Sequence, residues 1–192
     1  MLVFSALILR GIRIREQRVP QAGARFWRDM RAGLRFVAGN RLLLTLAVLA
    51  GGWQMCNQAA TVVQILYATR TLGLSEQAVG LSYVAMGVGT VTASVFGDRF
   101  TRRVGPGPSL LWGCAVCGSG WLLLALMPAG PWGVAAFALM LLLFGVGAVL
   151  IFINFLALRQ AVTPEPLLGR MTSTMRWLSL LPAGPGALLG GW

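Results

Sequence analysis

The sequence predicts an all-α integral membrane protein, and two observations lead to that class. The 192 residues are 57% hydrophobic and only 11% charged, whereas soluble domains are about half apolar and about a quarter charged. Charge is also confined to short stretches between long apolar segments, four of which approach or exceed the roughly 20 residues that cross a bilayer as a helix. Helices buried in a soluble core are the alternative, but four successive segments of this length disfavour it.

Five apolar segments make up most of the chain. In hydrocarbon every backbone N–H and C=O must pair within the protein, so we expect each segment to be helical. We expect a transmembrane bundle over 42–192. Its spans are expected at 42–69, 77–97, 109–127, 132–158 and 177–192.

Both ends of the sequence are apolar. Residues 1–9 would be only about 14 Å long as a helix, and they lack the basic start and cleavage site of a signal peptide. The last segment continues to Trp192 without a polar flank. We therefore expect a piece of a larger membrane protein, in which 1–9 is the end of a preceding transmembrane helix.

The distribution of arginine predicts the orientation. All 16 basic residues are arginine, and in the five connections from 10–41 to 159–176 they number 9, 1, 3, 0 and 3. Cytoplasmic loops carry the excess of basic residues, so 10–41, 98–108 and 159–176 are expected in the cytoplasm, and the turns at 70–76 and 128–131 outside. Much of the net charge of +11 is therefore a topology signal. The long uncharged runs argue against a nucleic-acid-binding domain.

The basic segment 10–41 contains an amphipathic pattern. Its apolar stripe consists of Phe26, Met30, Leu34 and Val37. Off that stripe lie Arg28, Arg31 and Arg35. This pattern predicts a helix that lies at the inner membrane interface against anionic headgroups, or that packs against the membrane domain.

The stretch "GDRFTRR" concentrates charge at the cytoplasmic end of the second span. Asp98 follows the last apolar turn, and three arginines come directly after it: Arg99, Arg102 and Arg103. A carboxylate at a half-desolvated helix end is unfavourable unless it is paired, and a nearby guanidinium supplies the partner. A simple stop-transfer charge cluster is the alternative interpretation.

The order D-R-x-x-R-R between two closely linked spans resembles the loop motif of the major facilitator superfamily, roughly G-x-x-x-D-R-x-G-R-R. Ser94 and Thr101 stand at the two glycine positions, so the match is partial. In that family the charges form a cytoplasmic latch that opens and closes during transport. The resemblance implies gating roles for Asp98, Arg99, Arg102 and Arg103.

Other parts of the chain agree with this resemblance. The 10–41 segment looks like the central cytoplasmic loop between two six-helix halves, which would make the spans the seventh to eleventh helices. The stretch "LRQAVTPEPLLGRMTSTMRWL" looks like the tenth-to-eleventh loop of drug-exporter-type members. The resemblance implies a major-facilitator-type helical bundle, supplied here as about five helices of the C-terminal half.

That family resemblance carries functional expectations. It implies a secondary active transporter in the inner cell membrane, multi-pass, that exports drug-like or siderophore-like compounds and is neither an enzyme nor dependent on a cofactor. The expected partners are the lipid bilayer, a small-molecule substrate and a missing N-terminal half. A non-catalytic membrane subunit, or a permease component of another transport complex, is the alternative function.

The first span carries a polar helical face. It consists of Gln54, Asn57, Gln58, Thr61 and Gln64. Amides are unfavourable in hydrocarbon, so this face is expected to look into protein or a watery cavity. In the resembling family the seventh and tenth helices line the central cavity, and Asn154 is the matching polar residue of the tenth. Hydrogen bonding between helices without ligand contact is the alternative.

Small residues and prolines indicate how the helices pack. Ala85, Gly89, Ala93 and Gly97 recur at four-residue spacing, a pattern that lets helix backbones approach closely. In the last span, Pro182 and Pro185 are expected to bend the helix.

The remaining signals exclude several functions. Cys114 and Cys117 form C-x-x-C, but inside an apolar span without the surroundings of a redox motif, so they are interpreted as packing residues. The chain has no histidine for a nucleophile–histidine pair and no phosphate-binding Gly-Lys-Ser/Thr loop, and no metal site is expected. No acidic residue lies deep in a span, so a proton-coupling carboxylate would belong to the missing half.

Overall fold

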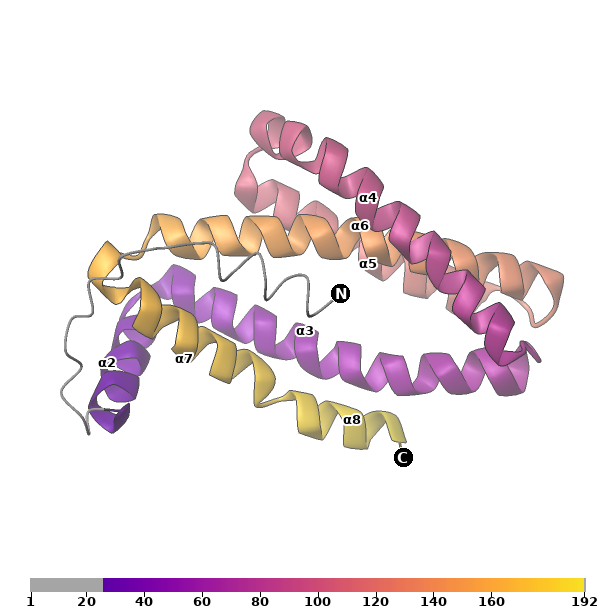
Figure 1. Cartoon of the computed structure of the whole chain (residues 1–192), viewed down its shortest axis with the longest axis horizontal. Coiled ribbons are helices and arrows are strands. Elements are labelled where there is room, and N and C mark those ends of the chain that lie inside the picture. Colours follow the sequence, from indigo (N-terminus) through magenta and orange to yellow (C-terminus); the bar gives the residue numbers. More distant parts are fainter. Residues whose placement is uncertain (1–25, 192) are drawn as a thin grey trace, which may run out of the picture.

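The computed structural model describes residues 26–191, which form helices joined by short connections (Figure 1). The expected helix end at 1–9 and the arginines before Phe26 lie outside the described residues. In chain order the elements are α2 (Phe26–Gly39), α3 (Arg41–Leu66), the π-helical turn η1 (Tyr67–Thr71), α4 (Glu76–Val104), α5 (Pro106–Leu126), α6 (Pro131–Ala161), the 3-10 turn η2 (Glu165–Leu167), α7 (Leu168–Leu180) and α8 (Ala183–Gly191).

The predicted all-α membrane fold is confirmed. Among residues 26–191, α4, α5 and α6 are each long and apolar enough to cross a membrane, and α2 and α3 add a fourth candidate if they are counted as one bent span. The polar face of α3 lowers its hydropathy, which is why this helix does not qualify alone. No strand occurs in the described part of the chain.

The segment expected as a fifth span is divided between two helices. α7 ends at Leu180 and α8 begins at Ala183, with Leu181 and Pro182 in a turn between them. Proline has no N–H to donate and its ring obstructs the preceding turn, so a break at Pro182 follows from its chemistry. A continuous crossing of the membrane over 177–192 stays a prediction.

α4 is longer than the apolar segment that predicted it. The expected span ends at residue 97, whereas the helix continues to Val104, so the charged residues Asp98–Arg103 lie in its last two turns and not in a loop. Nothing in "DRFTRRV" breaks a helix, and basic residues near the C-terminus interact favourably with the helix dipole. Gly105, at φ +92°, ends the helix in a conformation that side chains rarely adopt.

The connections after α3, α4 and α5 are short because each has a residue suited to a turn. Gly73 and Gly130 have positive φ angles, and proline occupies the first position of both α5 and α6, where its missing N–H is not needed. The Ser75 hydroxyl caps α4 by accepting from the backbone N–H of Ala78 at 3.2 Å.

α2 and α3 meet at a bend of 107°. Asn40 makes this corner, since its side-chain oxygen caps α3 by accepting from the N–H groups of Leu42 and Leu43. α2 buries Gly33 and Val37 against α7 and α3, while Leu34, expected in the apolar stripe, is 36% exposed. For α2 the structure therefore shows packing against the membrane domain, with Arg28, Arg31 and Arg35 exposed.

α6 packs closely on both α4 and α5 through glycines. On the α4 side, Gly89 lies against the Leu142 carbonyl and Gly145 against the Met86 carbonyl. On the α5 side, Gly113 and Gly147 face each other. Any β-carbon at these glycines would overlap backbone or side-chain atoms of the neighbouring helix, so the spacing of the three helices depends on their absence.

The small-residue stripe on α4 lies on this packed face. Gly89, Ala93 and Gly97 are buried, and Ala85 is half-buried. The opposite side of the helix presents exposed valines, as expected of a surface in contact with lipid: Val84, Val88, Val91 and Val95.

α3 packs mainly against α7 and α8, which run alongside it (Figure 1). Gly186 and Gly190 of α8 lie on the backbone of Met55 and Ala59, and Pro182 contacts Gly51 at the break between α7 and α8. Of the two prolines expected to bend the last span, Pro182 lies in the break and Pro185 lies within α8.

Two apolar clusters form the core, one toward each end of the bundle. The first joins α2, α3, α5 and α7 and consists of Val37, Leu43, Leu46, Ala47, Leu110, Met171 and Met175. The second joins η1, α5 and α6 and consists of Ala68, Leu124, Ala136, Phe137, Met140 and Leu141. The middle of α3 lies between these clusters and has few contacts with α6.

The glycine contact between α4 and α6 predicts the effect of adding one methyl group. Gly89→Ala should lower the melting temperature of the detergent-solubilised chain, because overpacking of a close contact costs about 1–3 kcal/mol. Gly87→Ala is the matched control: it lies on the same helix, has no neighbouring atom within 4 Å of an added β-carbon, and should melt at the wild-type temperature or above it. Equal melting temperatures for the two variants would contradict the packing described here.

Candidate functional site

The polar face predicted on α3 lies near the middle of that helix. Gln54, Asn57 and Gln58 are half-buried, and their side chains make no hydrogen bond to another described residue. The Thr61 hydroxyl donates to the Asn57 carbonyl of its own helix at 2.7 Å. Gln64 is 7% exposed, and its Nε2 donates to the Tyr83 hydroxyl of α4 at 3.3 Å. Of the five residues on this face, Gln64 is therefore the one whose side chain bonds to another described helix.

The other side of α3 is apolar and exposed. Val63 is 51% exposed, and helical periodicity places it on the side opposite Gln54. This arrangement is typical of a helix with one face toward lipid and one toward protein or water. The amides thus lie on the face whose hydrogen bonds must be supplied by a partner or by a water-filled cavity.

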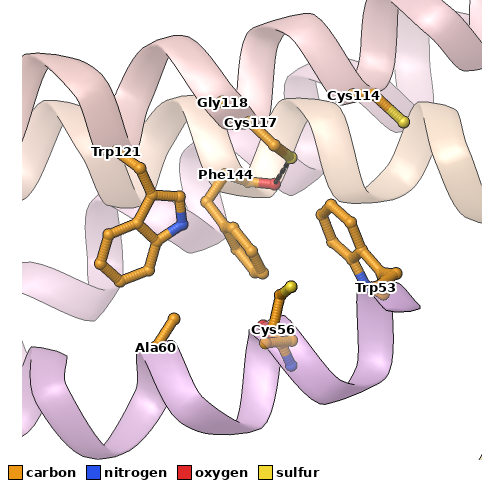
Figure 2. Close-up of a pocket in the computed structure, with 9 residues that line it drawn as sticks. Trp53, Cys56, Ala60, Cys114, Cys117, Gly118, Trp121 and Phe144 are labelled. Atoms are coloured by element: carbon orange, nitrogen blue, oxygen red, sulfur yellow. Dashed lines mark hydrogen bonds between the residues drawn. The ribbon is translucent and has the colours of Figure 1, made fainter. Parts of the chain in front are cut away.

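A crevice of about 370 Å³ separates α3 from α5 and α6 next to this face (Figure 2). This volume is within the range of small-molecule sites. The lining is almost entirely apolar and consists of Trp53, Cys56, Asn57 and Ala60 from α3, Cys114, Cys117, Gly118 and Trp121 from α5, and Phe144 from α6. Asn57 belongs to both the polar face and the crevice.

Aromatic side chains organise the crevice. The Phe144 ring projects from α6 toward α3 between Trp121 and Trp53 (Figure 2). Its centroid lies 5.8 Å from that of Trp53, with 14° between the ring planes. The Cys117 thiol donates to the Phe144 carbonyl at 3.7 Å. The crevice can therefore accommodate flat apolar groups by stacking and dispersion, with one amide at its edge.

Sequence reasoning missed the aromatic residues of this crevice. The signal was available, since Cys114, Cys117, Gly118 and Trp121 recur at the spacing of one helical face. The two cysteines were interpreted as packing residues. The structure places them in the crevice wall, with Cys117 buried and Cys114 half-buried.

The charged end of α4 lies on the surface. Asp98 and Arg102, one helical turn apart, form an ion pair in which both side chains are about two-thirds exposed. Such a pair contributes only about 0.3–0.5 kcal/mol. Arg99 and Arg103 are exposed and make no ion pair with a described residue. These four candidate gate residues lie together on the exposed end of α4.

Asn154 lies in a closed contact of three helices, not in an open cavity. It is fully buried, and its Nδ2 lies 3.2 Å from the Thr101 hydroxyl of α4 and 3.0 Å from the Ser109 hydroxyl of α5. In this conformation Asn154 therefore does not share a surface with the half-buried amides of α3. Thr101 and Ser109 were not expected to take part in such a contact.

Residues 26–191 contain no group of three or more histidine, cysteine, aspartate or glutamate side chains placed to hold an ion.

The comparison with protein families agrees with this architecture. The family model of the Major Facilitator Superfamily matches residues 1–187. Comparisons with curated proteins and with solved structures give no match. The family match covers nearly the whole chain, which also has the long apolar helices of a multi-pass membrane protein. The chain therefore belongs to the Major Facilitator Superfamily, a family of membrane transporters of small molecules.

Proposed function

We propose that this chain is part of a drug-exporter-type member of the family and supplies one wall of its transport site. The observation that carries the proposal is the set of amides of Gln54, Asn57 and Gln58 at the middle of α3, which have no hydrogen-bond partner among residues 26–191. Amides at membrane depth require a polar partner, and a substrate cavity supplies one. The adjoining aromatic crevice favours drug-like or siderophore-like compounds with flat apolar groups.

The remaining wall would come from an N-terminal half. Major-facilitator transporters consist of two six-helix halves that rock around a central site, whereas the described residues offer three or four candidate spans. We place the complete transporter in the inner cell membrane, with the basic connections in the cytoplasm. The exposed charges at the end of α4 would then form a cytoplasmic latch.

The crevice generates a prediction about ligand binding. Trp121→Ala should weaken the binding of a planar aromatic dye to the purified chain about three- to tenfold, because one aromatic pair contributes about 0.5–1.5 kcal/mol. Trp112→Ala is the matched control, since Trp112 lies on the same helix but is 56% exposed and does not line the crevice. Fluorescence titration in detergent gives both affinities. Equal losses in the two variants would show that the dye binds elsewhere.

The latch generates a prediction about transport. In the complete transporter, Asp98→Asn should strongly reduce transport and leave stability within about 0.5 kcal/mol of wild type, because the exposed pair with Arg102 contributes little to folding. Glu76→Gln, at the other end of α4, should leave transport unchanged. Initial rates in membrane vesicles of equal protein content measure the effect. A wild-type rate for Asp98→Asn would refute the latch.

The proposal also predicts the behaviour of the chain alone. Expressed in a strain that lacks its own exporters, the 192-residue chain should insert into the membrane without exporting dye, because the second wall of the site is absent. Efflux should appear when the chain is joined to its N-terminal half. Energy-dependent efflux by the chain alone would instead support a homodimeric transporter, and absence of efflux from the joined protein would favour a non-transporting subunit.

A further inference from the structure

Three helices meet in a buried polar contact at the charged end of α4. The contact, here called the Asn154 node, consists of Thr101 of α4, Ser109 of α5 and Asn154 of α6. Asn154 and Ser109 are each 0% exposed. The two hydroxyl oxygens lie 3.0 Å apart and bond to each other as well as to the amide.

The geometry fixes which atom of the amide faces the hydroxyls. The same nitrogen of Asn154 lies 2.8 Å from the Leu150 carbonyl, which can only accept a hydrogen bond. Nδ2 has two hydrogens for three acceptors, so one hydrogen is donated to the Leu150 carbonyl and the other is shared between the two hydroxyl oxygens. The oxygen, Oδ1, is buried and has no partner among the described residues.

An asparagine at this position is a poor way to stabilise a helix bundle. A buried acceptor without a donor is unfavourable, and a leucine of similar size would fill the space without one. The asparagine instead fixes the relative position of the helices, because its nitrogen must lie within hydrogen-bond distance of particular atoms of α4 and α5. The node therefore specifies an arrangement and adds little to its stability.

The atoms that the node fixes belong to the charged end of α4. Thr101 lies between Asp98 and Arg102, and Ser109 lies in the first turn of α5 just beyond Gly105. Only Gly105 separates α4 from α5, so the node attaches both sides of this connection to α6. Thr101 also stands at one of the two positions where the sequence departs from the glycines of the family motif. Its hydroxyl accepts the hydrogen bond from Asn154.

We propose that Asn154 is a positioning residue: through Nδ2 it fixes the connection between α4 and α5 to α6, so that this connection cannot shift unless the node opens. The node lies within the described helices, so its role is independent of the transported compound and of a second half.

Hydrogen–deuterium exchange of the full chain in detergent tests the proposal. Asn154→Leu and Thr101→Val should each accelerate backbone exchange over residues 101–110 about fivefold. This factor corresponds to the loss of a hydrogen bond that contributes about 1 kcal/mol. The double variant should accelerate it no further, since both changes open the same node. Thr101→Ser, which keeps the hydroxyl, should restore wild-type exchange.

Matched controls separate positioning from general packing. Thr92→Val removes an exposed hydroxyl of α4 that bonds only within its own helix, and Ser119→Ala does the same on α5. Both should leave exchange over 101–110 unchanged. The melting temperature of Asn154→Leu should stay at or above the wild-type value. Unchanged exchange in both Asn154→Leu and Thr101→Val would overturn the proposal, as would uniform acceleration throughout α4, α5 and α6.

Discussion

The absence of water from the hydrocarbon core is the constraint on which the rest of this structure depends. It requires backbone groups to pair within helices, and it keeps charged residues out of the middle of the long helices α3, α4, α5 and α6. It also removes the hydrophobic drive for helices to associate, so they must pack by close contact. The glycines of α6 meet that requirement on two sides, because Gly145 admits α4 and Gly147 admits α5.

The same constraint makes the polar side chains within the apolar helices informative. A polar side chain at membrane depth needs a partner, and the chain satisfies its polar residues in two different ways. Asn154 and Gln64 find partners on neighbouring helices. Gln54, Asn57 and Gln58 have no hydrogen-bond partner within the described residues, and Asn57 also lines the crevice between α3, α5 and α6. This difference distinguishes structural amides from candidate transport amides.

The described helices pack as two units. α4, α5 and α6 form one tightly packed unit, while α3 packs with α7 and α8 (Figure 1). The two units are joined mainly by the apolar clusters toward each end. Between those clusters the Trp53–Phe144 stack is a direct contact across the crevice. The crevice therefore lies between two units, each of which packs closely within itself.

Sequence periodicity predicted the structural features that depend on a single segment, such as the positions of individual helices. The starts of α4, α5 and α6 fall within a few residues of the expected spans, because turn-forming glycine, proline and serine mark them. Hydropathy placed the end of α4 too early, since "DRFTRRV" is polar yet helical. The Asn154 node joins residues 45 and 53 positions apart, and no pattern within one helix specifies such a pairing. The spacing of residues on α5 indicates one wall of the crevice, but the crevice as a whole could not be predicted because its other walls come from α3 and α6.

Cysteine accessibility across the membrane tests the central claim most directly, namely that these helices cross a bilayer with the arginine-rich connections on one side. In a chain whose three native cysteines are replaced by alanine, single cysteines at Thr71, Ala129 and Val104 avoid the glycines of positive φ and lie at exposed turn or helix-end positions. In intact cells a membrane-impermeant maleimide should label Thr71→Cys and Ala129→Cys, and it should label Val104→Cys only after permeabilisation. Labelling of Val104→Cys in intact cells, or protection of either of the other two, would contradict this arrangement.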